Sequence, residues 1–180
     1  MPDIAASKIL IVASDRFEES ELFGPLDLLR AVGATVTIAA PEIGSILGTV
    51  RDIPGRSIDA DAIIDEVSAE AFDALLLPGG VSNPDHLRTN SKAVALIRAF
   101  AAAGKPVAAI CHAPWLLVEA DILRGRKATC WPSIRTDLRN AGAVLDPRKV
   151  VVDGNIITAE GPDDVPTFTA VLIEQVEAAA

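Results

Sequence analysis

The chain has 180 residues, half of them hydrophobic, and its formal net charge at pH 7 is −9. This length is sufficient for one domain with a substantial core. We expect a single domain over residues 1–180, because no linker, repeat or low-complexity tract interrupts the sequence. The acidic charge argues against general binding to nucleic-acid phosphates or anionic membrane surfaces. No apolar run approaches the roughly 20 residues that a membrane-spanning helix needs.

The spacing of cysteines and histidines, together with the motifs that are absent from the sequence, bears on the redox compartment and on metal and nucleotide cofactors. Cys111 and Cys130 are far apart in the sequence, which is a poor disulfide framework and favours a reducing cytoplasm. Residues 1–14 lack the charged region, apolar stretch and cleavage site of a signal peptide. The two cysteines and two histidines do not have the spacing of zinc ligands, and there is no GxGxxG or Walker loop. We therefore expect no metal and no nucleotide cofactor.

Strand-like and helix-like segments alternate along the chain. The strands are short apolar runs of the kind buried on both faces of a parallel sheet, and the helices show apolar residues at helical spacing. In the first half of the chain, we expect a strand over 8–14, a helix over 22–32 that stops at Gly33, a strand over 35–41, a hairpin or irregular excursion over 42–60, and a strand that runs into a glycine turn over 72–80. In the second half, we expect a helix over 91–104, a strand over 106–110, a helix over 113–123, a strand over 127–132 and a short helix over 133–142. A hairpin over 150–159 and a closing helix over 164–179 complete the chain.

This alternation predicts an α/β protein with an open, mostly parallel sheet and helices on both faces. Ligands of such sheets lie beyond the carboxyl ends of the strands. Three turns at that edge carry unusual residues: Glu18 after the first strand, Gly79-Gly80 after the third and Cys111 after the fourth. We expect these turns to converge.

Cys111 has two interpretations. Free cysteine often packs as a small buried hydrophobe, and Cys111 ends an apolar strand. A thiol between a strand and a helix, however, lies next to unpaired helix N–H groups, which favour the thiolate and lower its pKa. Small neighbours, Ala108, Ala109 and Ala113, would let the chain make a sharp turn there. The residues alone leave both interpretations open.

Four segments resemble the PfpI-type branch of the class I glutamine-amidotransferase-like superfamily, which holds intracellular proteases and glyoxalase- or deglycase-like stress proteins. They are FEESEL (17–22), LLPGG (76–80), AICHAPWLL (109–117) and VVVDGNIITAEGPDDVPTF (150–168). The resemblance covers nearly the whole chain, from about Lys8 to the closing helix. It implies a flavodoxin-like three-layer sandwich with Cys111 at a strand-to-helix nucleophile elbow.

The resemblance also implies the partners of the thiol. Glu18 matches the family glutamate that reaches the elbow, where repulsion from the thiolate would raise its pKa and fit it to shuttle protons. Glu19 and Glu21 are assigned instead to the acidic start of the helix. Arg16 stands where the family has glycine, and its guanidinium at the pocket rim could alter substrate choice. The N–H of Gly80, with that of Cys111 or His112, would form an oxyanion hole.

Four further residues are candidates for the site or for its surroundings: His112, Asp85, His86 and Cys130. His112 is adjacent to Cys111, but neighbours on a helix point about 100° apart, so its ring need not face the sulfur. The resemblance assigns it to the site, with an acid from a neighbouring subunit. Asp85 matches that acid, as an aspartate where the protease-like members have glutamate. His86 is expected on the surface or in an interface. Cys130 is expected in the core.

Glutamine hydrolysis is argued against, because an amidotransferase triad needs a histidine well downstream of its cysteine and none follows His112. We favour attack by Cys111 on a 2-oxoaldehyde such as methylglyoxal, a proton transfer by Glu18 and hydrolysis to a hydroxy acid. The resemblance extends this attack to early glycation adducts. The alternatives are a cysteine peptidase that uses Cys111 and His112, and a non-catalytic redox-sensing or chaperone-like stress protein. The resemblance implies a homo-oligomer with Asp85 near the interface.

Overall fold

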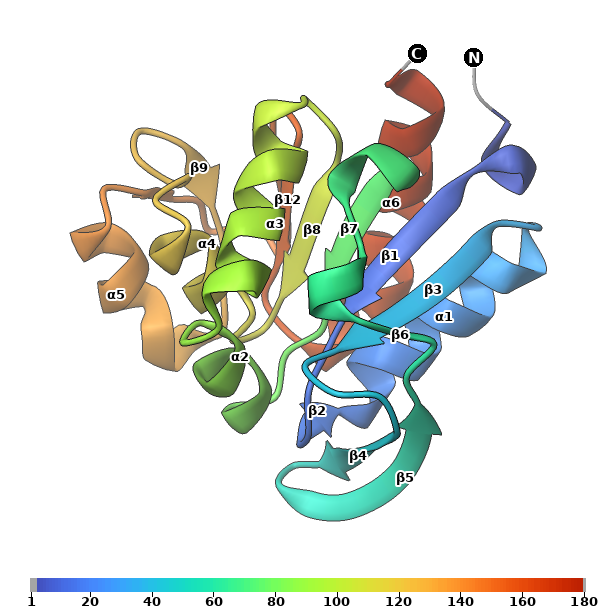
Figure 1. The fold of residues 1–180 in the computed structure, drawn as a ribbon. Coiled ribbons are helices and arrows are strands. Elements are labelled where there is room, and N and C mark those ends of the chain that lie inside the picture. Colours follow the sequence, from blue (N-terminus) through green and yellow to red (C-terminus); the bar gives the residue numbers. More distant parts are fainter. Residues whose placement is uncertain (1–2, 180) are drawn as a thin grey trace.

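The computed structural model describes residues 3–179, and its centre is a seven-stranded sheet of order β11-β12-β8-β7-β1-β3-β6 (Figure 1). The strands are β1 (Lys8–Val12), β3 (Thr35–Ala40), β6 (Ala62–Ile63), β7 (Ala74–Leu77), β8 (Val107–Ile110), β11 (Val150–Asp153) and β12 (Ile156–Ala159). All neighbours are parallel except the hairpin β11-β12. The order β3-β1-β7-β8-β12 is the 2-1-3-4-5 order of a flavodoxin-like sheet, which confirms the predicted fold class.

Helices cover both faces of this sheet and bury two separate cores. Strand β1 shows why, since its side chains alternate: Ile9 and Ile11 belong to one core, and Leu10 and Val12 belong to the other. Helices α1 (Glu19–Ala31) and α6 (Val165–Ala178) pack on the first core. The second is covered by α3 (Ser91–Ala102) and α4 (Pro114–Glu119), with α2 (Ser82–Leu87) below them in Figure 1. The result is a three-layer sandwich.

The predicted excursion over 42–60 is a hairpin that projects from the main sheet (Figure 1). It consists of β4 (Ser45–Val50) and β5 (Ile53–Asp59), and β4 also pairs in parallel with the short strand β2 (Phe17–Glu18). The two residues of its tip, Arg51 and Asp52, both have left-handed φ angles, of 50° and 69°. The hairpin thereby brings its tip next to the start of α1.

Two predicted elements are shorter than expected. The strand over 127–132 is reduced to β9 (Lys127–Ala128), which pairs with β10 (Val144–Leu145) outside the main sheet. Beyond it, Thr129 N–H donates to the side chain of Thr158, so the backbone leaves the ladder. The helix over 113–123 is only α4. The segment 133–142 contains α5 (Arg135–Asn140), as predicted, while the short helices α2, η1 (Ile4–Ala6), η2 (Ile64–Glu66), η3 (Ala69–Ala71), η4 (Pro132–Ile134) and η5 (Pro162–Asp164) were not predicted.

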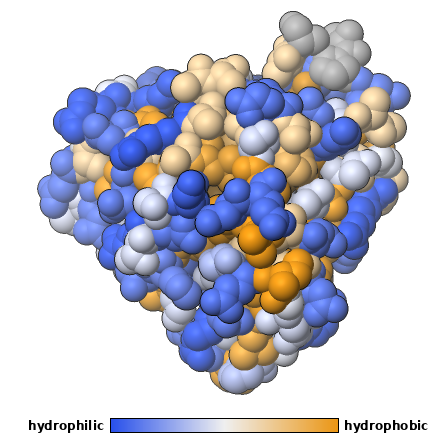
Figure 2. Space-filling view, viewed as in Figure 1, coloured by the Kyte–Doolittle hydropathy of each residue, from blue (hydrophilic) through white to orange (hydrophobic). Residues whose placement is uncertain are grey.

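The surface seen in Figure 2 is mostly hydrophilic, with apolar side chains in small patches. The largest exposed apolar fractions among the described residues are those of Ile43 (68%) and Ile53 (70%), at the base and tip of the hairpin. No helix within residues 3–179 combines the length and the apolar character needed to cross a membrane.

Candidate functional site

Cys111 lies on a sharp turn directly after β8. Its φ angle is 63°, in the left-handed region, which costs a non-glycine residue about 1–2 kcal/mol. Two backbone hydrogen bonds hold the turn: Cys111 N–H donates to Ala159 O (3.0 Å), and Trp131 N–H donates to Cys111 O (2.8 Å). Ala109 and Ala113, beside the turn, are fully buried. The predicted strand-to-helix elbow is therefore present, and the surrounding fold maintains its strain.

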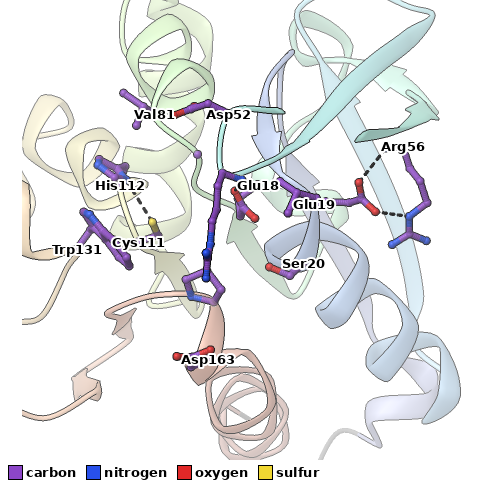
Figure 3. A pocket seen from close by; sticks show the side chains of 14 residues that line it. Glu18, Glu19, Ser20, Asp52, Arg56, Val81, Cys111, His112, Trp131 and Asp163 are labelled. Atoms are coloured by element: carbon purple, nitrogen blue, oxygen red, sulfur yellow. Dashed lines mark hydrogen bonds and ion pairs between the residues drawn. The ribbon is translucent and has the colours of Figure 1, made fainter. Parts of the chain in front are cut away.

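A pocket of about 590 Å³ opens above the elbow, at the carboxyl edge of the sheet. The three turns that were predicted to converge do so, since Glu18, Gly80 and Cys111 all line it (Figure 3). Its other lining residues are Glu19, Ser20, Val50, Arg51, Asp52, Arg56, Val81, His112, Trp131, Pro162 and Asp163. The hairpin tip, the elbow and the turn before α6 thus enclose one cavity.

The carboxyl beside the thiol is that of Glu21, not that of Glu18 as predicted. Glu21 is fully buried, and its Oε2 accepts a hydrogen bond from Gly79 N–H at 2.9 Å. A hydrogen bond with the Cys111 thiol lowers the pKa of Glu21 against the larger effect of burial. The other oxygen, Oε1, is buried without a well-aligned partner in the described part of the chain. A buried polar atom of this kind points to a functional role.

The sequence contains a signal for Glu21 that its assignment to the helix start overlooked. The buried residues of α1 are Glu21, Leu22, Pro25, Leu26 and Leu29. Glu21 therefore continues the apolar stripe backwards by one turn, four residues before Pro25. A carboxyl group on the buried face of a helix is not a dipole-complementing surface charge, and this position distinguishes Glu21 from Glu19.

Glu18 lies elsewhere in the same pocket. It is the half-buried N-cap residue of α1, and its Oε2 accepts a hydrogen bond from Arg51 N–H at 3.1 Å. Burial raises the pKa of Glu18, with the charge of Asp52 adding to the rise and the hydrogen bond from Arg51 opposing it. Through the hydrogen bond from Arg51 N–H, Glu18 holds the tip of the hairpin in place. Glu19 pairs with Arg56 (Figure 3).

Arg16 has a φ angle of 66°, a conformation that favours glycine. Its guanidinium donates to Asp52 O at 3.3 Å, so it lies on the hairpin tip outside the residues that line the pocket. The predicted guanidinium at the rim is therefore directed at the hairpin backbone.

The thiol and the carboxyl of Glu21 form one coupled pair. Burial raises the pKa of Glu21 to about 8. Burial, followed by the charge of Glu21, raises the pKa of Cys111, while the backbone N–H groups of His112 and Gly80 lower it. The predicted net lowering of the thiol pKa by the helix start is therefore wrong, because desolvation outweighs these N–H groups. At neutral pH the pair retains a proton, and a protonated Glu21 would relieve the repulsion that opposes a Cys111 thiolate.

Positions 79 and 80 require glycine, because neighbouring atoms approach the backbone too closely for a Cβ. A Cβ at Gly79 would lie 2.4 Å from Glu21 Oε2 and 2.8 Å from Cys111 Cβ. Gly80 has a φ angle of 81°, and a Cβ there would lie 2.5 Å from Arg16 O. Of the predicted oxyanion-hole donors, the N–H groups of Gly80 and His112 face the sulfur. That of Cys111 is unavailable, because it donates into the sheet to Ala159 O.

The imidazole of His112 faces the sulfur, although helix geometry did not require it to. The distance from His112 Nδ1 to Cys111 Sγ is 3.2 Å, drawn as a dashed line in Figure 3. The ring packs against Trp115 and Trp131, with centroid distances of 5.5 and 6.0 Å. Burial lowers the pKa of His112, and the charge of Asp52 opposes this shift. Sequence reasoning missed both tryptophans and Ser133, whose Oγ lies 3.2 Å from His112 Nε2.

The remaining candidates lie outside the pocket. Asp85 is exposed, and its carboxylate pairs with Arg88 at 2.8 Å. Its predicted contact with His112 is between subunits, so a single chain leaves it a prediction. His86 is exposed, and Cys130 is fully buried, with a pKa raised by burial to about 12. Within residues 3–179, no three His, Cys, Asp or Glu side chains are grouped so as to hold a metal ion.

A flavodoxin-like sheet with a cysteine held on a left-handed turn at its carboxyl edge defines an α/β protein with a cysteine elbow. The chain belongs to the DJ-1/PfpI family, whose model matches residues 7–175. It is 44% identical to protein/nucleic acid deglycase 2 of Escherichia coli (strain K12) over 165 residues, covering 91% of this chain and 94% of the relative.

Two further proteins show the range of this similarity. YraA of Bacillus subtilis (strain 168), named as a suspected cysteine protease, is 39% identical over 163 residues, covering 91% of this chain and 94% of the relative. The crystal structure of a ThiJ/PfpI domain protein from Brachyspira murdochii matches with a TM-score of 0.89 at 26% identity, covering 96% of this chain and 98% of that chain. The predicted family is therefore confirmed.

Proposed function

We propose that this protein is a cysteine-dependent enzyme that acts on reactive 2-oxoaldehydes and on the early adducts they form with amines or thiols. The observation that carries the proposal is the buried Glu21 carboxyl, with a pKa near 8, beside the Cys111 thiol on the floor of the pocket. A carboxyl tuned near the working pH is suited to giving and taking protons. The name of the deglycase relative supports the same chemistry.

The first step is addition. The sulfur of Cys111 bonds to the aldehyde carbon of methylglyoxal, the carbonyl π bond breaks, and the oxygen takes up the proton that the thiol and Glu21 share. The product is a hemithioacetal. The N–H groups of Gly80 and His112 face the sulfur, and we expect them to stabilise the oxyanion that develops on the carbon bonded to it. With an early amine adduct, the C–S bond forms as the C–N bond breaks, and the amine leaves with a proton.

The second step moves a hydrogen between neighbouring carbons. Ionised Glu21 removes the proton on the carbon bonded to sulfur and returns it to the adjacent former ketone carbon. The hydroxyl proton passes to the former ketone oxygen in the same step, so the hemithioacetal becomes a thioester of lactate. Water then adds to the thioester, the C–S bond breaks, and lactate and the Cys111 thiol are released. The sum is methylglyoxal plus water giving lactic acid, so no oxidant, reductant or cofactor is consumed.

A cysteine peptidase is the second candidate, because the 3.2 Å contact between Cys111 Sγ and His112 Nδ1 is one that an acyl-enzyme mechanism uses. In that function His112 would protonate the leaving amine, and Asp85 of a neighbouring subunit in a homo-oligomer would orient the ring. The first function is favoured, because conversion of the free 2-oxoaldehyde needs only the thiol and the carboxyl that one chain brings together.

Lactate release tests the proposal. Wild-type protein is incubated with methylglyoxal and with its adduct on N-acetylarginine, and lactate and freed N-acetylarginine are measured. We expect release of both by wild type and by the matched variant Cys130→Ala, and none above background by Cys111→Ala. If wild type releases no lactate but cleaves peptides in a Cys111-dependent manner, the peptidase is the correct function. Oxidation of Cys111 by mild peroxide without either turnover would indicate a redox sensor.

A further inference from the structure

Both ring nitrogens of His112 have a partner inside one chain. Nδ1 lies 3.2 Å from Cys111 Sγ, and Nε2 lies 3.2 Å from Ser133 Oγ. Within the same chain Asp85 pairs with Arg88, and its expected contact with the ring is one between subunits. In the described residues, the group at Nε2 is therefore a hydroxyl.

Ser133 is held in place through the backbone of the nucleophile itself. Trp131 N–H donates to Cys111 O at 2.8 Å, and Ile134 N–H donates to Trp131 O at 3.1 Å, so the short helix η4 is attached to the elbow at its first turn. Ser133 is the middle residue of that helix. These hydrogen bonds fix the position of the Ser133 hydroxyl relative to Cys111. A group that orients a catalytic ring must be fixed in this way.

The ring has little freedom to turn away from Ser133. Two indole rings pack against the His112 ring: Trp131 stacks on it at a centroid distance of 6.0 Å, and Trp115 lies tilted to it at 5.5 Å. Trp115 is itself fixed, because its Nε1–H donates to Asp137 at 2.8 Å and the guanidinium of Arg88 lies 4.7 Å from its ring centroid.

A hydroxyl at Nε2 differs chemically from a carboxylate. It rotates to donate to a bare Nε2 or to accept from Nε2–H, whereas a carboxylate only accepts. The hydrogen bond at Nε2 is therefore kept whether Nδ1 carries a proton or not. His112 can take a proton from Cys111 at Nδ1, or deliver one to a leaving amine, without losing its orienting contact. The charge of Asp52, on the hairpin, raises the pKa of His112, and the carboxyl of Glu21 is the other titratable group beside the sulfur.

We propose that Ser133 is the positioning residue for His112, whose hydroxyl holds Nε2 while the ring exchanges a proton at Nδ1 beside the Cys111 sulfur. This role rests on the proposed function, because the exchanged proton is the one that the departing amine needs. Ser133 acts through His112 and is not expected to contact substrate.

The test compares Ser133→Ala with Ser133→Thr, which restores the hydroxyl. Kinetics are measured on the methylglyoxal adduct of N-acetylarginine. Loss of one hydrogen bond should lower kcat about three- to tenfold in Ser133→Ala with KM unchanged, and Thr should recover most of it. ¹⁵N NMR of labelled histidine reads the tautomer of His112 directly. The chain has only one other histidine, His86, which is assigned with His86→Gln.

We expect the ¹⁵N signals of His112, and not those of His86, to shift in Ser133→Ala and to return in Ser133→Thr. Unchanged His112 signals and unchanged kcat in Ser133→Ala would overturn the proposal. Equal losses in the Ala and Thr variants would also overturn it, because the effect would then be steric. If wild type makes no lactate, the proposed function fails while the NMR comparison still decides whether Ser133 holds His112.

Discussion

The two cysteines of this chain occupy similar positions and have different surroundings. Each follows a strand and precedes a proline closely, and each thiol is buried, with 6% of Cys111 and none of Cys130 exposed. Burial raises the pKa of both. Only Cys111 lies on a left-handed turn at the pocket, with two backbone N–H groups and a buried carboxyl directed at its sulfur. Burial suppresses the reactivity of a cysteine, and the polar groups directed at the sulfur of Cys111 allow it to act as a nucleophile.

The sharpest way to break this comparison is to label both thiols. With iodoacetamide at pH 7.5, we expect Cys111 to be alkylated at least about a hundredfold faster than Cys130, because Cys111 opens to the pocket, where two backbone N–H groups face its sulfur, whereas Cys130 is fully buried. Mass spectrometry of peptides after timed quenching measures both rates in one sample. Equal rates, or faster labelling of Cys130, would remove the distinction.

The next largest effect should separate Glu21, which is buried beside Cys111, from Glu18, which lines the pocket. Glu21→Gln should lower lactate formation by about 10²–10⁴-fold, because the amide cannot transfer a proton. Glu18→Gln is the matched control. Its amide oxygen can still accept from Arg51 N–H, so we expect less than about a threefold loss. The reverse ranking would restore Glu18 as the proton carrier.

Stability against pH should also distinguish Glu21. Its pKa is raised from 4.5 to about 8 in the folded state, so the folded chain binds the proton more tightly. The stability linked to that proton is fully present below pH 4.5 and is lost as the pH rises through 8. The free energy of unfolding of wild type should therefore fall relative to Glu21→Gln by about 3–5 kcal/mol over this window.

Urea denaturation at a series of pH values measures this difference. Glu19→Gln is the control, because Arg56 lowers the pKa of Glu19 and the linked stability is lost as the pH falls. A wild-type curve parallel to that of Glu21→Gln would contradict the raised pKa of Glu21.

The smallest effect concerns backbone strain at Arg16, in the turn between β1 and β2. Arg16→Gly should stabilise the fold by about 1 kcal/mol, because glycine adopts the φ angle of 66° without strain, and the long exposed hydrogen bond to Asp52 O contributes little. Arg16→Ala removes the same guanidinium but keeps the strain, so it should give no gain. Equal unfolding midpoints for the Gly and Ala variants would contradict strain at this position.

The sequence predicted the sheet, the two helical layers and the elbow, because buried parallel strands and glycine stops are local patterns. It failed where a contact joins distant segments. The side-chain acceptor of Thr158 that ends β9 and the backbone bond from Trp131 to Cys111 have no local signature. Elements of two residues, such as β6, leave too short a pattern to recognise.

The glutamate was missed for a different reason. Three acidic residues within four positions, 18, 19 and 21, all fit the acidic start of a helix. What distinguishes Glu18 from Glu21 is the position at which the helix begins. Glu18 has an extended backbone (φ −70°, ψ 122°), whereas Glu21 lies inside α1 on its buried face. Helix starts are the least certain part of a sequence-based assignment, so extending the apolar stripe backwards from Leu26 is the better guide.

Infrared spectroscopy measures directly whether Glu21 holds a proton beside Cys111 at neutral pH. We expect a C=O stretching band of a protonated carboxylic acid that disappears only as the pH rises through about 8, that is missing from Glu21→Gln and that shifts in Cys111→Ala. A band that is already lost near pH 4.5, or one that persists unchanged in Glu21→Gln, would contradict this expectation.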